Sequence, residues 1–310
     1  MKRADINDKQ LITHLSTLSE DELASYVLRS GSYRLSAVHA TRMINQMRAN
    51  HGLGILETFI LGHAYLGAAL MVSNLKGKDR IGIEVEGDGA AGGFSVEATA
   101  GGGVRGYINN PAIELDEELT SFDMGPFIGN GMLSVTKKLE KAKHPYTGRV
   151  ELAYGNVAQD LANYFRQSEQ KPTAFNLSIQ FDKEGRVVGA AGLMAQAFPG
   201  AEDEYAEDLD RTIRGLPSLG ALFAAGLSTE QLIHGHFERF DPVPVGQKEI
   251  QFYCHCSKER FARFLSAMPL AEIRDIRDNG PFPLKTTCHN CSTTYEFTQS
   301  DIEKAYQMAR

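Results

Sequence analysis

The sequence lacks the excess of positive charge that a generic nucleic-acid-binding protein carries. Its 310 residues include 39 Asp and Glu against 32 Lys and Arg, which gives a formal net charge of -7 at pH 7. Because phosphate backbones are bound mainly by clustered Lys and Arg, this balance argues against a nucleic-acid partner. A Walker-type phosphate-binding loop is also missing, so the sequence shows no motif for an ATP-driven activity.

The chain also has little that would direct it out of the cell or into a membrane. Basic residues at the N-terminus are not followed by an apolar run and a small-residue cleavage site, so no signal peptide is expected. Residues 58–75 carry no formal charge, but polar side chains and glycines interrupt the stretch, which favours a packed core helix over a membrane span. We therefore expect a cytosolic protein with no membrane partner.

Cysteine is scarce, and its placement is the most informative feature of the composition. All four cysteines lie between residues 254 and 291. In a reducing compartment, four clustered cysteines bind metal or sense redox state more often than they form structural disulfides.

The first 199 residues are predicted to form one α+β domain. Ser19 and Glu22 match a capping box before an apolar face, which predicts a helix that ends before Gly31. Further helices are predicted over residues 34–49, 55–75 and 156–166. Alternating apolar residues predict strands over 80–86, 94–98, 131–136 and 149–153, and a hairpin from 173–181 and 186–196.

Residues 87–92 match the dinucleotide-binding pattern G-x-G-x-x-G, but the context is wrong for it. That motif needs a following helix whose N-terminus meets the phosphate, whereas a second strand is predicted here. A glycine-rich hairpin turn is the better interpretation.

Two further segments follow the large domain. An acidic run with interrupting glycines predicts a helical linker over residues 200–240, either as a solvated helix face or as a marginally stable, redox-sensitive segment. Pro242 and Pro244 mark the next boundary, and residues 241–310 are predicted to form a small C-terminal zinc-binding, redox-switch domain.

The chemistry of that C-terminal domain is carried by two cysteine pairs, Cys254 with Cys256 and Cys288 with Cys291. Thiolates suit tetrahedral zinc, and two close pairs from distant segments can surround one ion. We expect one Zn²⁺ per chain held by all four residues. The alternative that the four cysteines are buried side chains with no shared function does not explain their paired spacing.

Nearby histidines offer other ligand sets. His255 and His289 could each replace a cysteine, but the all-sulfur set is already complete. His234 and His236 could form a second metal pair, but no third ligand is visible near them, so a surface or capping role is favoured.

Loss of the metal would have a large structural effect. Zinc binding to such modules contributes on the order of 10 kcal/mol of folding free energy at neutral pH. Zinc thiolates remain open to oxidants, and their conversion to disulfides deletes the ligands. Oxidation would then act as an unfolding switch.

At these residues the sequence resembles the 33 kDa heat-shock protein family of redox-regulated holdase chaperones. The C-x-C pair is followed by Ser-Lys-Glu-Arg and a later C-x-x-C, which is similar to the zinc signature of the family. The resemblance extends through the large domain at Gly87-Asp88-Gly89, Arg105-Gly106, Gly129-Asn130-Gly131, Tyr164-Phe165, Ser168-Glu169-Gln170, Pro172-Thr173 and residues 196–199.

The resemblance implies a sequence of events. The reduced protein would hold zinc and be inactive, whereas oxidation would form disulfides Cys254–Cys256 and Cys288–Cys291, release zinc and unfold the linker. The oxidised protein would form a homodimer, hold unfolding or aggregation-prone client proteins without ATP, and pass them to ATP-dependent foldase chaperones. No catalytic triad or carboxylate pair can be identified, so an enzyme is not expected.

Two other classes remain open from the sequence. The C-terminal domain could be a nucleic-acid-binding zinc ribbon, although acidic residues interleave with its basic ones. The C-x-x-C pair could instead be a thiol oxidoreductase motif, although no βαβ unit is recognisable around it.

Overall fold

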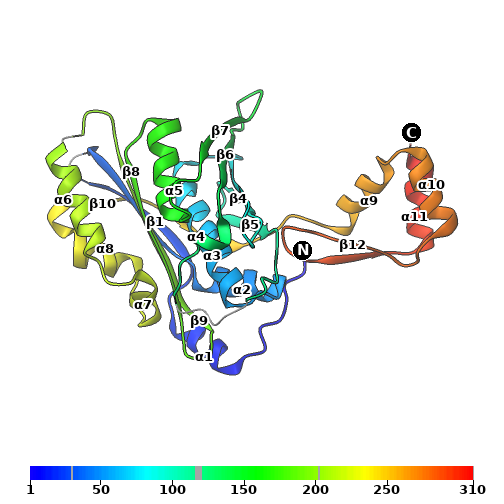
Figure 1. The fold of residues 1–310 in the computed structure, drawn as a ribbon, viewed down its shortest axis with the longest axis horizontal. Helices are drawn as coiled ribbons and strands as arrows, with labels where there is room; N and C mark the ends of the chain where they lie inside the picture. Colours follow the sequence, from blue (N-terminus) through cyan, green and yellow to red (C-terminus); the bar gives the residue numbers. More distant parts are fainter. Residues whose placement is uncertain (29–30, 116–120, 202, 310) are drawn as a thin grey trace.

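The computed structural model describes residues 1–28, 31–115, 121–201 and 203–309. Within them lie two large sheets with helices between and outside them, and a smaller module that projects to one side (Figure 1). This mixed architecture confirms the α+β class.

The first sheet is antiparallel and has the strand order β10-β1-β2-β9-β8. Its strands are β1 (Glu22–Leu28), β2 (Tyr33–His39), β8 (Thr173–Phe181), β9 (Val187–Ala197) and β10 (Val243–Glu249). The hairpin predicted from residues 173–196 is thus confirmed as β8 and β9.

The second sheet has the order β11-β5-β4-β3-β6-β7, antiparallel except for the β11–β5 pair. Its strands are β3 (Arg80–Gly87), β4 (Phe94–Thr99), β5 (Gly103–Ile108), β6 (Gly131–Lys138), β7 (Tyr146–Glu151) and β11 (Gln251–Phe252). Residues 87–92 form the turn of the β3–β4 hairpin, as predicted. Gly93 completes that turn with φ +96°, and a side chain there would overlap the carbonyl oxygen of Val85.

A central helix joins the two sheets. Helix α3 (Ile55–Met71) with the 3₁₀ turn η2 (Val72–Asn74) contacts strands of both sheets, and its residues 56–71 are all buried. The segment Ile55–Asn74 is long and apolar enough to span a membrane, but 94% of its most apolar window is buried inside the protein. Burial of this kind confirms the predicted core helix.

The other elements surround this core. They are α1 (Lys9–Thr17), α2 (Thr41–His51), α4 (Gly125–Ile128), α5 (Val157–Tyr164) with a π-helical turn (Phe165–Glu169), and, in the linker, α6 (Asp203–Arg214), α7 (Leu219–Ala224), α8 (Thr229–Phe237) and η4 (Glu238–Phe240). The C-terminal module contains α9 (Lys258–Ser266), α10 (Leu270–Asn279), α11 (Gln299–Met308) and the β12 (Leu284–Thr287)–β13 (Thr294–Phe297) hairpin.

Two predictions near the N-terminus are wrong. The segment that follows Ser19 is strand β1, and the predicted helix over residues 34–49 is strand β2 followed by α2. Both faces of this sheet are covered, so Leu23 packs in one core and Tyr26 and Leu28 in the other. Strands buried on both faces lose the simple alternation that distinguishes a strand from a helix.

The linker packs as helices on the outer face of the first sheet, opposite α3 (Figure 1). Leu209 and Ile213 of α6, Phe223 of α7 and Phe237 of α8 are buried there. On the solvent side of α6, Asp208 and Asp210 pair with Arg211 and Arg214 at 3.1 and 2.7 Å. Glu207, Asp208 and Asp210 thus lie on a solvated helix face, whereas Glu202 and the side chains of Asp203 and Glu204 lie outside the described part of the chain.

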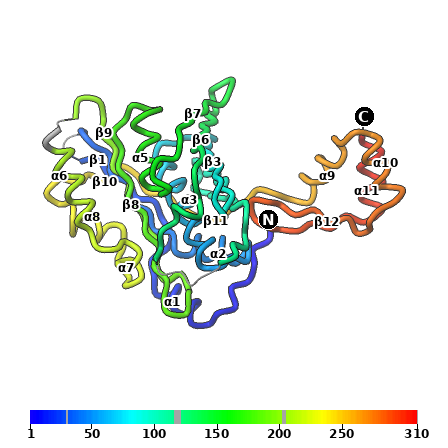
Figure 2. The backbone as a smooth tube through the Cα atoms, viewed as in Figure 1, coloured from blue at the N-terminus to red at the C-terminus, as the bar shows by residue number. Residues whose placement is uncertain are grey.

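The division at residue 241 stays a prediction, but strand pairing continues past it. Strand β10 pairs with β1, and β11 pairs with β5, so residues 243–252 belong to the two large sheets. After β11 the chain leaves the two large sheets and enters the projecting module (Figure 2).

Candidate metal centre

Two short loops carry the four cysteines. Cys254 and Cys256 lie between β11 and α9, and Ser257 caps α9 by accepting a hydrogen bond from the Arg260 amide. Cys288 and Cys291 form the turn of the β12–β13 hairpin. In that turn the carbonyl oxygen of Cys288 accepts from the amides of Cys291 and Ser292 at 3.2 and 2.7 Å.

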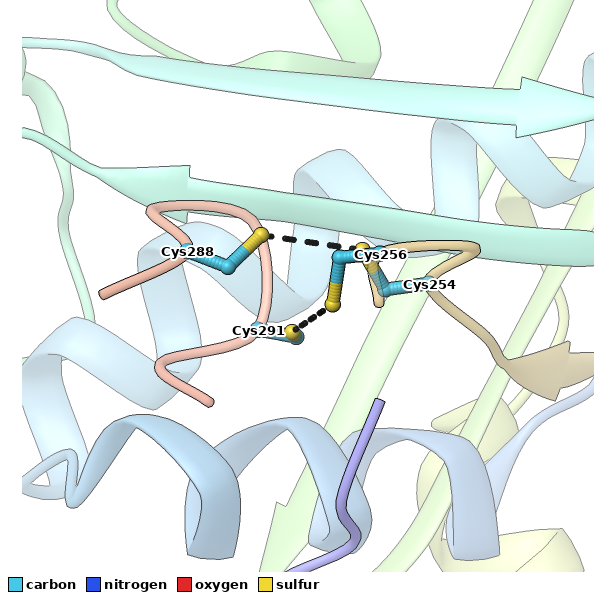
Figure 3. A group of neighbouring side chains, drawn as sticks. All are labelled: Cys254, Cys256, Cys288 and Cys291. Carbon is cyan, nitrogen blue, oxygen red and sulfur yellow. Dashed lines mark hydrogen bonds between the residues drawn. The ribbon is translucent and has the colours of Figure 1, made fainter. Parts of the chain in front are cut away.

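The loops bring all four sulfurs into one cluster. The Sγ atoms lie within 4.8 Å of one another, and the four residues are at most 7% exposed (Figure 3). The shortest separations printed between the two loops are 3.8 Å from Cys254 to Cys288 and 3.3 Å from Cys256 to Cys291. A tetrahedral zinc ion with Zn–S bonds of about 2.3 Å would separate its ligands by roughly 3.8 Å, so the cluster fits such an ion.

No histidine belongs to this cluster among the residues that the structure describes. The exposed ring of His289 meets Tyr107 edge-on, with ring centroids 5.7 Å apart. His234 and His236 lie exposed at the end of α8, where they are not grouped with a further metal-binding side chain in the described ranges.

Polar contacts around the cluster differ between the sulfurs. The Arg105 guanidinium donates to Cys254 Sγ at 3.5 Å, and the Tyr295 hydroxyl lies 3.2 Å from Cys256 Sγ while donating to the Cys256 carbonyl at 3.0 Å. Burial raises the pKa of Tyr295, and its neighbour Cys256 adds to that shift, so the hydroxyl stays a donor.

The pKa values of Cys254, Cys288 and Cys291 are shifted in different directions. Hydrogen bonds with Cys288 and Cys291, and with Arg105, lower the pKa of Cys254 far below its usual range. The same bond with Cys254 raises the pKa of Cys288, and Cys254 raises that of Cys291 to about 11. Of these three sulfurs, that of Cys254 is therefore the first to become a thiolate, which is the form that binds metal.

The large domain supplies part of this environment, which the sequence reasoning missed. Asn50, at the end of α2, donates to the Cys291 carbonyl at 2.9 Å, and His51 Nδ1 lies 2.8 Å from the Ser292 hydroxyl. The amide of Cys254 donates to the Met1 sulfur at 3.2 Å. These residues are more than 200 positions from their partners, and Arg105 is 149 positions from Cys254, so no local pattern could reveal them.

Comparisons with known proteins agree on one family. The sequence model described as Hsp33 protein matches residues 21–298. A protein of Desulforamulus reducens named 33 kDa chaperonin is 33% identical over 287 residues, covering 92% of this chain and 97% of the relative. A protein of the same name from Ruminiclostridium cellulolyticum is also 33% identical over 287 residues, covering 91% and 97%.

A solved structure gives the same answer. The crystal structure of a 33 kDa chaperonin from Thermotoga maritima superposes with a TM-score of 0.82 at 31% identity, covering 93% of this chain and 98% of that one. The family resemblance expected from the cysteine signature is thereby confirmed over most of the chain. With a matching family model, similar relatives over nearly full length and the same fold, the chain belongs to the Hsp33 family of chaperones.

Proposed function

We propose that this protein is a redox-regulated, ATP-independent holdase that acts in the cytosol. The observation that carries the proposal is the cluster of four buried sulfurs within 4.8 Å of one another. In the reduced protein, Cys254, Cys256, Cys288 and Cys291 bind one Zn²⁺ and the chaperone is inactive. The two cysteine loops, whose chain connection runs through α9, α10 and β12, would be joined through an ion that both pairs hold.

Oxidation reverses this state. Two of the cysteine thiolates would lose two electrons to one peroxide, which takes up two protons and becomes two waters, and the two sulfurs would form one disulfide. Two such steps pair Cys254 with Cys256 and Cys288 with Cys291 and release Zn²⁺. Because these disulfides lie within each loop, nothing then replaces the link that the ion made between the loops.

Loss of the metal is coupled to the linker and to client binding. The C-terminal module loses folding free energy on the order of 10 kcal/mol with its zinc. Unfolding of the linker then uncovers the apolar side chains buried between α6–α8 and the first sheet, which include Leu35, Leu193 and Phe223. This surface holds unfolding proteins, the oxidised chain forms a homodimer, and clients pass to ATP-dependent foldases.

Charge pairing in the C-terminal module supports a chaperone over a nucleic-acid-binding zinc ribbon. Lys258 pairs with Asp301 at 2.9 Å, Arg277 with Asp278 at 2.7 Å, and Lys285 with Glu296 at 3.3 Å. Paired cations offer little free charge to a phosphate backbone.

The test follows metal, thiols and activity in the same samples. Zinc content and free thiols are measured before and after mild peroxide treatment, together with suppression of client aggregation. One zinc released, four thiols lost and activity gained would support the proposal. Equal suppression by reduced and oxidised protein would contradict it, and turnover of a disulfide substrate by the reduced protein would indicate an oxidoreductase.

A further inference from the structure

A cationic side chain from the large domain contacts a sulfur of the cysteine cluster. Arg105 lies on β5, and one of its terminal nitrogens donates to Cys254 Sγ at 3.5 Å. Its other two nitrogens donate to one oxygen of Glu97 at 3.1 and 2.8 Å. Glu97 is the residue opposite Arg105 in the antiparallel β4–β5 pair.

This geometry fixes the guanidinium before any metal binds. The Arg105 side chain is 17% exposed and that of Glu97 is 30% exposed, so both are held against the sheet. A planar guanidinium held from one side by a carboxylate presents its remaining N–H group in a defined direction. That direction is the Cys254 sulfur.

The charge of a filled site makes this contact significant. Four thiolates and one Zn²⁺ carry a net charge of -2 in a buried cluster, and buried charge is unfavourable unless a nearby opposite charge compensates it. Among residues 1–28, 31–115, 121–201 and 203–309, Arg105 is the only arginine or lysine side chain for which the structure gives a hydrogen bond to one of the four sulfurs.

The remaining contacts between the large domain and the loops do not depend on sulfur charge. Asn50 binds a backbone carbonyl and His51 binds a hydroxyl. Met1 contacts backbone groups of the first loop: its ammonium donates to the Cys256 carbonyl at 2.8 Å, and its sulfur accepts from the Cys254 amide. Strand β11 and the Tyr253 amide, which donates to the Val104 carbonyl at 2.9 Å, are held by backbone pairing with β5. Among the contacts that the structure describes between the large domain and the loops, the Arg105 hydrogen bond is the one that joins a cationic side chain to a cysteine sulfur, so oxidation of the thiolates changes it directly.

We propose that Arg105 is a positioning residue of the metal centre, which compensates the negative charge of the metal thiolates and holds the first cysteine loop on the large domain only while that charge is present. The inference rests on the proposed zinc site. Disulfide formation leaves the sulfurs neutral, so Arg105 loses its anionic partner and keeps only Glu97. Release of the loop from β5 then accompanies release of the metal.

The experiment compares four full-length reduced proteins loaded with zinc: wild type, Arg105→Gln, Arg105→Lys and Arg80→Gln. Arg80 is the matched control, because it also lies near Glu97, at 3.8 Å, and no hydrogen bond from it to a sulfur is present among the described residues. The measurement is the rate of zinc transfer to a chromogenic chelator without oxidant. Hydrogen exchange of residues 254–256 reports on the loop.

Arg105→Gln is expected to transfer zinc about 10- to 100-fold faster than wild type, the range typical of lost contacts just outside the metal ligands. Exchange of residues 254–256 should rise with it, while Arg80→Gln behaves as wild type. Arg105→Lys keeps the charge and should recover most of the wild-type rate.

Three outcomes separate the possibilities. Equal transfer rates for wild type and Arg105→Gln would overturn the inference, as would a lysine variant that is as fast as the glutamine variant. If Arg105→Gln does not fold, the zinc-transfer rate of Arg105→Lys is compared with that of wild type. A rate near wild type supports the inference, and a much faster rate overturns it. A wild-type protein that binds no zinc would instead refute the proposed function on which the inference rests.

Discussion

Replacing Phe223 by alanine should open the linker without touching the metal centre. Phe223 lies in α7, is fully buried, and stacks on His39 of β2 with ring centroids 4.9 Å apart. It packs in the cluster that joins the linker helices to the first sheet. Truncation of a buried phenylalanine costs about 3–5 kcal/mol, because both its burial and the packing around it are lost.

That cost falls mainly on the segment that Phe223 anchors. Since each 1.4 kcal/mol is tenfold in an opening equilibrium, exchange of the amides of residues 203–240 should accelerate by roughly 10²-fold or more. The reduced, zinc-loaded variant should also suppress client aggregation without oxidant, because the covered apolar face becomes accessible.

The assay is hydrogen exchange by mass spectrometry, with zinc content measured on the same samples. Phe264→Ala is the matched control, since that phenylalanine is 59% exposed on α9 and its loss should change little. Wild-type protection of residues 203–240 in Phe223→Ala would refute the reasoning. Loss of zinc from the variant would show that the linker and the metal centre cannot be separated.

Three further predictions concern the metal, the helix packing and pH. Cys256→Ser should lose zinc and unfold residues 254–309 while the two large sheets persist. Metal analysis and hydrogen exchange measure these effects, and retention of one tightly bound zinc would contradict the four-sulfur site. Gly189→Ala should lower the free energy of unfolding by about 1–3 kcal/mol, because the new methyl group would overlap the Gly220 carbonyl and lie 2.8 Å from the Ala224 amide. The control Gly235→Ala, where nothing lies within 4 Å of the added methyl group, should be neutral or stabilising. Urea unfolding measures both variants, and equal effects would contradict the prediction. Burial lowers the pKa of His39 from 6.5 to about 4, so its contribution to stability is present above pH 6.5 and is lost as pH falls toward 4, by about 3 kcal/mol at most. The free energy of unfolding of His39→Gln should therefore fall less than that of wild type as the pH is lowered from 6.5 toward 4. Comparing the two proteins at each pH cancels the opposite trend from Asp21, whose pKa burial raises to about 7.

The sequence predicted the elements whose periodicity survives in the fold. The second sheet has alternating burial, for example in β4, and its strands β3, β4 and β6 were predicted close to their observed bounds. The prediction for β7 starts three residues late, and β5 and β11 were not predicted. Strand β2, by contrast, has six buried residues among seven, and only Ala40 separates it from α2. Its pattern merged with that of the helix, so the two were predicted as one helix.

The candidate site also contains residues that the sequence predicts and residues that it does not. The four cysteines could be predicted because thiolate ligands and their spacing carry chemistry that does not depend on the fold. Arg105 and Asn50 carry no such signal, since arginines and asparagines at strand and helix ends are common. The pairing of β11 with β5 brings Arg105 to Cys254, and Asn50 reaches the second cysteine loop from the end of α2.

The pairing of β10 with β1 has a consequence for how far the linker can travel once it melts. Ala197 at the end of β9 pairs with Tyr33, the opposite neighbour of Tyr33 is Leu28, and next to Leu28 is Val27, which pairs with Val243 at the start of β10. The two ends of residues 198–242 are therefore anchored in one row across four strands, about 14 Å apart. A melted linker is a closed loop and not a free tail, so it can disorder without moving either anchor. Its reach would be that of a tethered chain, so a melted linker would stay beside the sheet that it covers in this structure.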